Sequence, residues 1–259
     1  MSYATIADSY NEINFIDSQA AADVGKAVVE IVGAGALIAD LGGGAGRISV
    51  PVAEAGARII ALDFEYEMLR VSRENAKRRG VEARHVNADV VHLPFKSNSF
   101  DGCITTSVYH LVPAWRDSIK EVARIMKPGG VFIIGRNVME AGSCADRVRK
   151  QLRQIAGTFD PSIRPTDAAG PELLKYIGSI GGQLDKPITV TSWVESESPN
   201  QIFERIRNRK HNETWALSED TYAKVVSDMP AWIEQNFSDP DEVFESSSEF
   251  VLYPIRGLA

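Results

Sequence analysis

One glycine-rich stretch constrains the fold of this chain more than any other: residues 39–47 read Ala-Asp-Leu-Gly-Gly-Gly-Ala-Gly-Arg. It follows a short apolar run at 36–38 and precedes an apolar-periodic segment at 48–53, which predicts a strand, a glycine turn and the start of a helix. Glycine tolerates positive φ and has no Cβ, so such a turn lets the backbone approach a ligand and directs free N–H groups toward it. The pattern favours a nucleoside-containing cofactor, with a bare strand-to-helix turn as the alternative.

The spacing of the glycines separates two kinds of cofactor. A dinucleotide fingerprint requires a third glycine at position 47, where this chain has Arg47. The chain instead has Gly42-x-Gly44-x-Gly46, with the acid Asp40 two residues before the first glycine. This resembles the first motif of the class I S-adenosylmethionine (SAM) methyltransferases, in which that loop passes under the methionine part of the cofactor.

Strand-like and helix-like segments alternate along the first half of the chain with short links. Apolar runs predict strands at 36–41, 58–62, 82–86, 102–107 and 131–134. Such alternation specifies a parallel sheet covered by helices on both faces. We therefore predict an α/β fold with a Rossmann-like, seven-stranded, mostly parallel sheet and an antiparallel edge strand, formed by runs at 188–194 and 243–253.

Five motifs recur in order across residues 35–135. They are Asp40 to Gly46, Asp63 with Met68-Leu69, Ala88-Asp89 with Leu93-Pro94-Phe95, Phe100-Asp101, and Lys127-Pro128-Gly129-Gly130. In this order and spacing they resemble the ubiquinone/menaquinone-biosynthesis-like methyltransferases, also called methyltransferase type 11. The resemblance implies SAM as methyl donor and S-adenosyl-L-homocysteine as product. It also implies a single SAM-dependent methyltransferase domain over 1–259 with its cofactor-binding core at 35–135.

The same resemblance assigns cofactor contacts residue by residue. Gly42, Gly44 and Gly46 would line the methionine and ribose, and Asp40 would lie near the ammonium group. Asp63, at the end of the second strand, is placed to accept hydrogen bonds from both ribose hydroxyls, with a helix N-cap as the alternative role. The other implied contacts are Phe64 and Met68 against adenine, Asp89 at the adenine amino group with Val90 beside it, and the backbone of Thr105 and Thr106 at the methionyl end.

Position 47 departs from the family, which more often has a smaller or polar residue there. Arg47 either reaches a carboxylate of cofactor or substrate or is a solvated arginine of the first helical turn.

Methyl transfer from SAM requires alignment and exclusion of water, and a base only where the acceptor carries a proton. His110 stands just past the fourth strand, at the carboxyl end of the sheet, and is the first candidate for a base or a substrate hydrogen bond. A structural histidine is the alternative. Tyr109 and His211 are further catalytic candidates, and Tyr10, Arg209 and Trp215 are substrate-binding candidates. The four histidines, at 85, 92, 110 and 211, have no ligand spacing, so no metal is predicted.

The predicted edge strands are separated by an insert at 198–241 with helical patterns at 199–207 and 218–237. In similar small-molecule methyltransferases, helices added here and at the N-terminus cap the substrate. The resemblance therefore implies that 1–34 and 198–241 form a cap. The segment 209–215 resembles one found in several type 11 members and is expected at the pocket mouth, with a polar interhelical loop as the alternative.

Composition narrows the acceptor. A net charge of −7 argues against nucleic acid as the main partner. Neither a signal-like start nor a bilayer-length apolar run is present, which predicts a cytoplasmic protein, monomeric or homodimeric, without a membrane partner. We predict methylation of O, N or C on a small metabolite. The alternatives are tRNA methylation, and a methyltransferase-fold protein that uses SAM non-canonically or only binds a ligand.

Overall fold

The computed structural model describes residues 18–161, 169–215 and 217–258. These residues divide into two compact units. We call them the sheet unit (18–136, 169–191 and 250–258) and the helical unit (137–161, 192–215 and 217–249). The sequence predicts one domain over 1–259, and that assignment stays a prediction.

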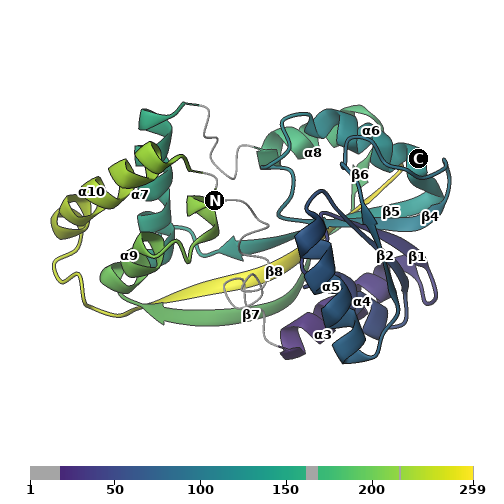
Figure 1. The fold of residues 1–259 in the computed structure, drawn as a ribbon, viewed down its shortest axis with the longest axis horizontal. Helices are drawn as coiled ribbons and strands as arrows, with labels where there is room; N and C mark the ends of the chain where they lie inside the picture. The colour runs from purple at the N-terminus through teal and green to yellow at the C-terminus, as the bar shows by residue number, and fades with distance from the viewer. Residues whose placement is uncertain (1–17, 162–168, 216, 259) are drawn as a thin grey trace. The chain divides into compact units, whose positions relative to one another are not determined.

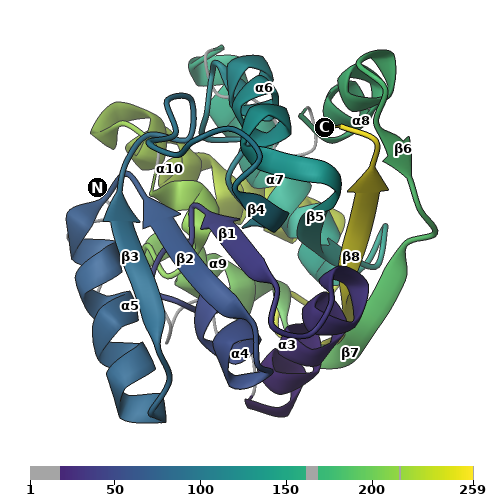
Figure 2. The same ribbon diagram turned by 90° about the vertical axis from the view of Figure 1, so that its right-hand side faces the viewer.

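The described strands form one eight-stranded sheet in the order β3-β2-β1-β4-β5-β8-β6, with β7 paired to β8. Strands β1 to β5 pair with one another in parallel, and β6 is antiparallel to β8 (Figure 2). The bounds are β1 Leu37–Leu41, β2 Arg58–Asp63, β3 Ala83–Asn87, β4 Phe100–Thr106, β5 Met126–Met139, β6 Gln183–Leu184, β7 Ile188–Glu197 and β8 Phe244–Arg256. The Rossmann-like α/β prediction with an antiparallel edge is confirmed.

The strand count is eight rather than the predicted seven. The additional strand is the two-residue β6, which ends before the link to β7. Within that link Asp185 N donates to Pro254 O at 2.9 Å, and Pro187 has no N–H to continue a ladder. Two separate strands, β6 and β7, therefore pair with β8 at this edge of the sheet.

Helices cover both faces of the sheet unit (Figure 1). On one face lie α3 (Ser18–Val32), α4 (Ser49–Glu54) and α5 (Tyr66–Arg79), and on the other lie α6 (Trp115–Ile125) and α8 (Ala169–Ser179). The residues around the end of helix α5 explain where it stops. Gly80 adopts a left-handed conformation at φ 68°, and Lys77, Arg78 and Arg79 occupy the last turn, where cations favour the helix dipole.

The motif residues Asp101 and Lys127 have a structural role. One carboxylate oxygen of Asp101 accepts from Leu37 N at 2.8 Å, and the other lies 2.7 Å from Lys127 Nζ. The side chain therefore ties β4 to its neighbours β1 and β5. Strand β5 begins at Met126, earlier than the predicted 131, because Phe100 pairs with Met126 before a register shift in β4.

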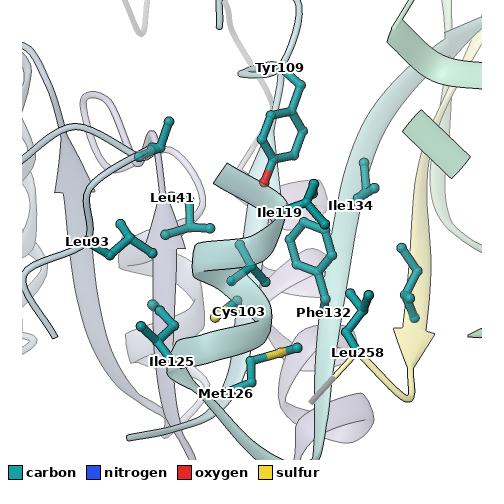
Figure 3. Packing of buried hydrophobic residues seen from close by; sticks show 14 of the residues in the cluster. Leu41, Leu93, Cys103, Tyr109, Ile119, Ile125, Met126, Phe132, Ile134 and Leu258 are labelled. Atoms are coloured by element: carbon teal, nitrogen blue, oxygen red, sulfur yellow. The ribbon is translucent and has the colours of Figure 1, made fainter. Parts of the chain in front are cut away.

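A core cluster of the sheet unit packs between the strands and α6 (Figure 3). Cys103 is fully buried there, and burial raises the pKa of its thiol, as expected of a core cysteine. Tyr109 belongs to the same cluster, and its ring meets Phe132 edge-on at 6.4 Å between centroids.

The helical unit contains α7 (Cys144–Phe159), α9 (Pro199–Arg207), the short 3₁₀ helix η2 (Asn212–Thr214) and α10 (Glu219–Asn236). Ser198 begins α9 with a capping box to Gln201, and Ser218 caps α10. Apolar faces of α7, α9 and α10 form a separate buried cluster. Both helices predicted in the insert are confirmed. The predicted cap role of 1–34 and 198–241 stays a prediction, and residues 1–17 lie outside the described part of the chain.

Candidate functional site

The candidate site lies at the carboxyl edge of the sheet unit, where the strand order reverses. From β1 the chain moves to β2 and β3 on one side, whereas β4 and β5 lie on the other. The pairing register sets Leu41 beside Leu62 and Thr105, so the residues that follow β1, β2 and β4 emerge at one edge. Ligands of open α/β sheets bind at such a switch point.

The glycine loop after β1 requires glycines for its backbone conformation. Gly42, Gly44 and Gly46 have φ of 72°, 52° and 84°. A Cβ on Gly42 would lie 2.2 Å from Val108 Cγ2, and one on Gly46 would lie 2.6 Å from Ser72 Oγ. The loop is thus packed closely against Val108, which follows β4, and against Ser72 of α5.

The sequence-based expectation that the loop directs free N–H groups at a ligand is corrected for four of its residues. The N–H groups of Gly42 and Gly43 donate to Leu62 O at 2.8 and 2.9 Å, and Gly46 N donates to Gly43 O at 3.0 Å. Gly44 N donates to Asp63 Oδ2 at 2.9 Å. Buried backbone donors need partners, and here the protein supplies them.

Asp63 connects this loop to the end of β2. Besides accepting from Gly44 N, its carboxylate accepts from Glu65 N at 2.9 Å. Burial raises the pKa of Asp63 above the ordinary range, although these backbone hydrogen bonds oppose the rise. The N-cap position of α5 is occupied by Glu65, so Asp63 is not the cap residue. Each Asp63 oxygen retains a further lone-pair direction for a hydroxyl donor.

Asp40 is the most unusual group of the site. Its side chain is 1% exposed, and Ser49 Oγ donates to Oδ2, while Oδ1 has no hydrogen-bond partner among the described residues. Burial raises the pKa of Asp40 to about 6, with Ser49 and Arg47 lowering it and Asp63 raising it. Arg47 is half-buried and acts on this carboxylate through its charge. A buried carboxylate oxygen without a donor is suited to accept from a cation.

The predicted adenine contacts lie around the ends of β2 and β3. Phe64 is 71% exposed, whereas Met68 is buried, with its Cε 3.2 Å from the position of a Cβ on Gly44. Asp89 accepts from Val91 N at 3.0 Å, and Val90 is buried beside it. The exposed ring of Phe64, which follows Asp63 at the end of β2, offers an apolar surface on which a nucleobase can pack.

Thr105 and Thr106, whose backbone is predicted to lie at the methionyl end of the cofactor, are the last residues of β4. Thr105 is buried and donates from Oγ1 to Leu41 O at 3.0 Å, and Thr106 is half-buried.

The segment after β4 places its two catalytic candidates differently. Tyr109 points into the core, toward Ile119 (Figure 3), and its hydroxyl has no hydrogen-bond partner among the described residues. Burial raises its pKa. His110, the next residue, is exposed. Of the two, only His110 has its side chain outside the core, where a ligand could come within hydrogen-bond reach.

The remaining candidates belong to the helical unit. The side chain of His211 is 11% exposed, and burial followed by the charge of Arg149 lowers its pKa to about 3. Trp215 is buried and donates from Nε1 to Arg209 O at 2.8 Å. The guanidinium of Arg209 stacks over Tyr222, with Cζ 3.8 Å from the ring centroid. Tyr10 lies outside the described residues.

Sequence reasoning missed three residues that brace the site. Ser49 binds Asp40, and Asn75 Nδ2 donates to Ala45 O at 2.8 Å. Asn87 Nδ2 donates to the carbonyls of Asp63 and Phe64 at 2.9 and 2.7 Å. The serine at position 49, at the start of the helix after the glycine loop, could have been predicted as a polar partner for a residue of the site. Residues 75 and 87 carried none, because their partners lie on other elements.

Neither a metal nor a membrane span is indicated in the described ranges. They contain no cluster of three or more His, Cys, Asp or Glu side chains that could hold an ion. They also contain no helix whose length and apolarity would let it cross a bilayer.

Strand order, glycine loop and the acids beside it together define a class I SAM-dependent methyltransferase domain. More narrowly, residues 39–134 match the family described as Methyltransf_11, methyltransferase domain. The resemblance read from the five motifs is thereby confirmed for this region.

Known relatives align with part of the chain. The demethylmenaquinone methyltransferase of Renibacterium salmoninarum is 35% identical over 111 residues, which are 42% of this chain and 45% of the relative. The alignment thus spans less than half of that protein.

Solved structures share the fold over most of the chain. The crystal structure of the [4+2]-cyclase SpnF has a TM-score of 0.63 at 18% identity, covering 98% of this chain and 93% of that one. Geranyl diphosphate C-methyltransferase from Streptomyces coelicolor, in complex with Mg²⁺, geranyl diphosphate and S-adenosyl-L-homocysteine, has a TM-score of 0.51 at 11% identity, covering 90% and 78%.

Proposed function

We propose that this protein transfers the methyl group of SAM to an oxygen, nitrogen or carbon atom of a small-molecule acceptor. The observation that carries the proposal is the buried Asp40 carboxylate, whose Oδ1 has no donor within the described residues while it adjoins the glycine loop. SAM carries an ammonium group and a sulfonium, and either cation would relieve that buried charge. The match to a methyltransferase domain supports the same donor.

The residues of the sheet unit fit this cofactor. Asp40 would hold the ammonium group, and Asp63 would accept from the ribose hydroxyls through its remaining lone pairs. Phe64 would cover the adenine, and Asp89 would accept from its amino group. Bound SAM supplies a methyl group on a sulfonium leaving group, so the protein contributes alignment and exclusion of water.

Proton removal is needed only where the acceptor carries a proton at the reacting atom. His110 is the proposed base, because it follows β4 at the carboxyl edge and its side chain is exposed. The buried Tyr109 is the weaker candidate.

Calorimetry and an isotope assay test the proposal. S-adenosyl-L-homocysteine should bind and raise the melting temperature, whereas NAD should do neither. Labelled methyl from SAM should then appear in a small-molecule extract and not in total tRNA. Binding of NAD without either SAM compound would overturn the cofactor, and label in tRNA alone would favour the tRNA alternative.

A second candidate is supported by the fold. The [4+2]-cyclase SpnF shares it across nearly the whole chain, so this fold is compatible with a reaction other than methyl transfer. In that case SAM would remain intact after turnover of the true substrate. Quantifying S-adenosyl-L-homocysteine against product separates the two candidates, since methyl transfer forms one per turnover.

A further inference from the structure

The helical unit buries one carboxylate among several cationic or titratable side chains. Glu213, in η2, has a side chain only 4% exposed. Arg153 Nη1 lies 2.6 Å from its Oε1, and Arg149 approaches both oxygens from α7 at 3.3 and 3.4 Å. His211 Nδ1 lies 3.5 Å from Oε2 and makes no hydrogen bond to a described residue. We call these four residues the Glu213 cluster.

The charges of this cluster do not balance. Burial favours a neutral Glu213, but the charges of Arg149 and Arg153 lower the pKa of that carboxyl, which keeps it ionised. His211 is neutral near pH 7, because burial and Arg149 lower its pKa to about 3. Two guanidiniums, which remain charged, thus face one carboxylate. The nearby Arg205 adds no net charge, since its Nη1 lies 2.9 Å from Glu197.

The two arginines are not equivalent. Arg153 is 15% exposed and makes the short contact to Glu213, so this pair alone completes a buried ion pair. Arg149 is 26% exposed, and both of its contacts are at the long limit of a hydrogen bond. Its guanidinium therefore has donors that Glu213 does not engage well, together with access to solvent. A guanidinium presents five donors in a planar fork that matches a carboxylate or a phosphate.

We propose that Arg149 anchors an oxyanion, a carboxylate or phosphate group of a small-molecule ligand, and that Arg153 and Glu213 hold its side chain in place. This anion site does not rest on the proposed function, because every residue of the Glu213 cluster belongs to the helical unit. The excess positive charge lies mainly on the partly exposed Arg149, and a bound oxyanion would neutralise it with charge-assisted hydrogen bonds.

The cluster allows a test in which two substitutions act in opposite directions. Arg149→Gln removes the anchor, whereas Glu213→Gln removes the competing carboxylate and raises the net charge by one. An anion site predicts weaker anion binding in the first variant and tighter binding in the second. A purely structural ion pair predicts no anion binding in either.

The probes are inorganic phosphate and succinate, titrated into the full chain by calorimetry at constant ionic strength in chloride. The wild type should bind at least one of them, and Arg149→Gln should weaken that binding about tenfold or more. Glu213→Gln should strengthen it severalfold. Lys150→Gln is the matched control: it makes the same change of charge on α7 at a side chain 59% exposed and paired with Asp146. Its affinity should equal that of the wild type.

Arg149→Lys keeps the positive charge but lacks the planar guanidinium with its paired N–H donors. This variant tests the anion site if Glu213→Gln fails to fold. It should bind the anion between the wild type and Arg149→Gln. Binding of neither probe by the wild type, or equal affinities in wild type and Arg149→Gln, would overturn the site. Competition between S-adenosyl-L-homocysteine and the bound probe would overturn an anion site separate from the cofactor site. If the protein binds the anion but does not bind SAM, the anion site is supported and only the proposed function is overturned.

Discussion

The sheet unit and the helical unit hold their polar groups by different means. At the glycine loop, backbone N–H groups bind two carbonyls and a carboxylate within a few residues of β1 and β2, and each Cβ missing from the loop makes room for a neighbour. In the Glu213 cluster, long side chains from α7 reach across about 60 positions of sequence to one carboxylate. The first arrangement is sensitive to added atoms, and the second is sensitive to a lost charge.

The largest effect is expected in the helical unit. Glu213→Gln leaves Arg149 and Arg153 without their carboxylate and should lower the free energy of unfolding by about 3–5 kcal/mol, because an unpaired buried charge is expensive. Denaturant titration measures it. Asp185→Asn is the control: its pair with Arg256 is about half exposed, so the loss should stay below about 1 kcal/mol. Equal losses for the two variants would show that burial does not distinguish these pairs.

The counterpart in the sheet unit is Gly42→Ala. The new Cβ meets Val108 at 2.2 Å and occupies φ 72°, so the expected loss is about 2–4 kcal/mol, together with loss of cofactor binding. Gly56→Ala, at φ 98° with no atom near its Cβ, isolates the cost of the backbone conformation. If Gly42→Ala costs no more than Gly56→Ala, close packing of the loop is not what requires the glycine.

Asp40 should oppose folding in a pH-dependent way. Its pKa is raised from 3.8 to about 6, so the folded state resists ionisation that the unfolded chain accepts. The penalty is small below about pH 3.5, where both states are mostly protonated, and it approaches its full size of about 3 kcal/mol above pH 6, for a shift of about two units.

Asp40→Asn should therefore be more stable than wild type at pH 7 by up to that amount, and equally stable near pH 3.5. The same variant should bind SAM more weakly. Thermal unfolding across this pH range gives the first result, and calorimetry gives the second. Lower stability of the variant at pH 7 would contradict the assigned cause of the raised pKa.

The smallest effect concerns Asp63→Ala, which should weaken binding of S-adenosyl-L-homocysteine by about 1–3 kcal/mol through loss of a charged acceptor. The loop also loses the acceptor of Gly44 N–H, so melting should be compared in the same experiment. Asp63→Asn retains one acceptor oxygen and is expected to lie in between. Unchanged affinity in both variants would reduce Asp63 to a brace for the loop.

The contrast between the units also explains what the sequence could predict. The glycine loop, Asp40 and Asp63 belong to short motifs whose spacing is dictated by a strand and its turn, so the fold and the edge of the sheet followed from local patterns. Such local patterns did not predict which of Tyr109 and His110 is accessible. The two residues are adjacent after β4, yet the side chain of Tyr109 lies in the core and that of His110 is exposed. His211 was identified as a candidate without its partners. Arg149 and Arg153 lie on a helix that no spacing rule links to it.

The internal hydrogen bonds of the glycine loop bear on turnover. Since Leu62, Gly43 and Asp63 accept from the loop's own N–H groups, its shape does not depend on a ligand to order it. Exchange of spent cofactor for fresh donor then carries little cost in backbone entropy. Association of the cofactor with the sheet unit should accordingly be fast, and its rate should depend on solvent viscosity only through diffusion. The residence time of the cofactor is then set by how quickly its own contacts with the protein break.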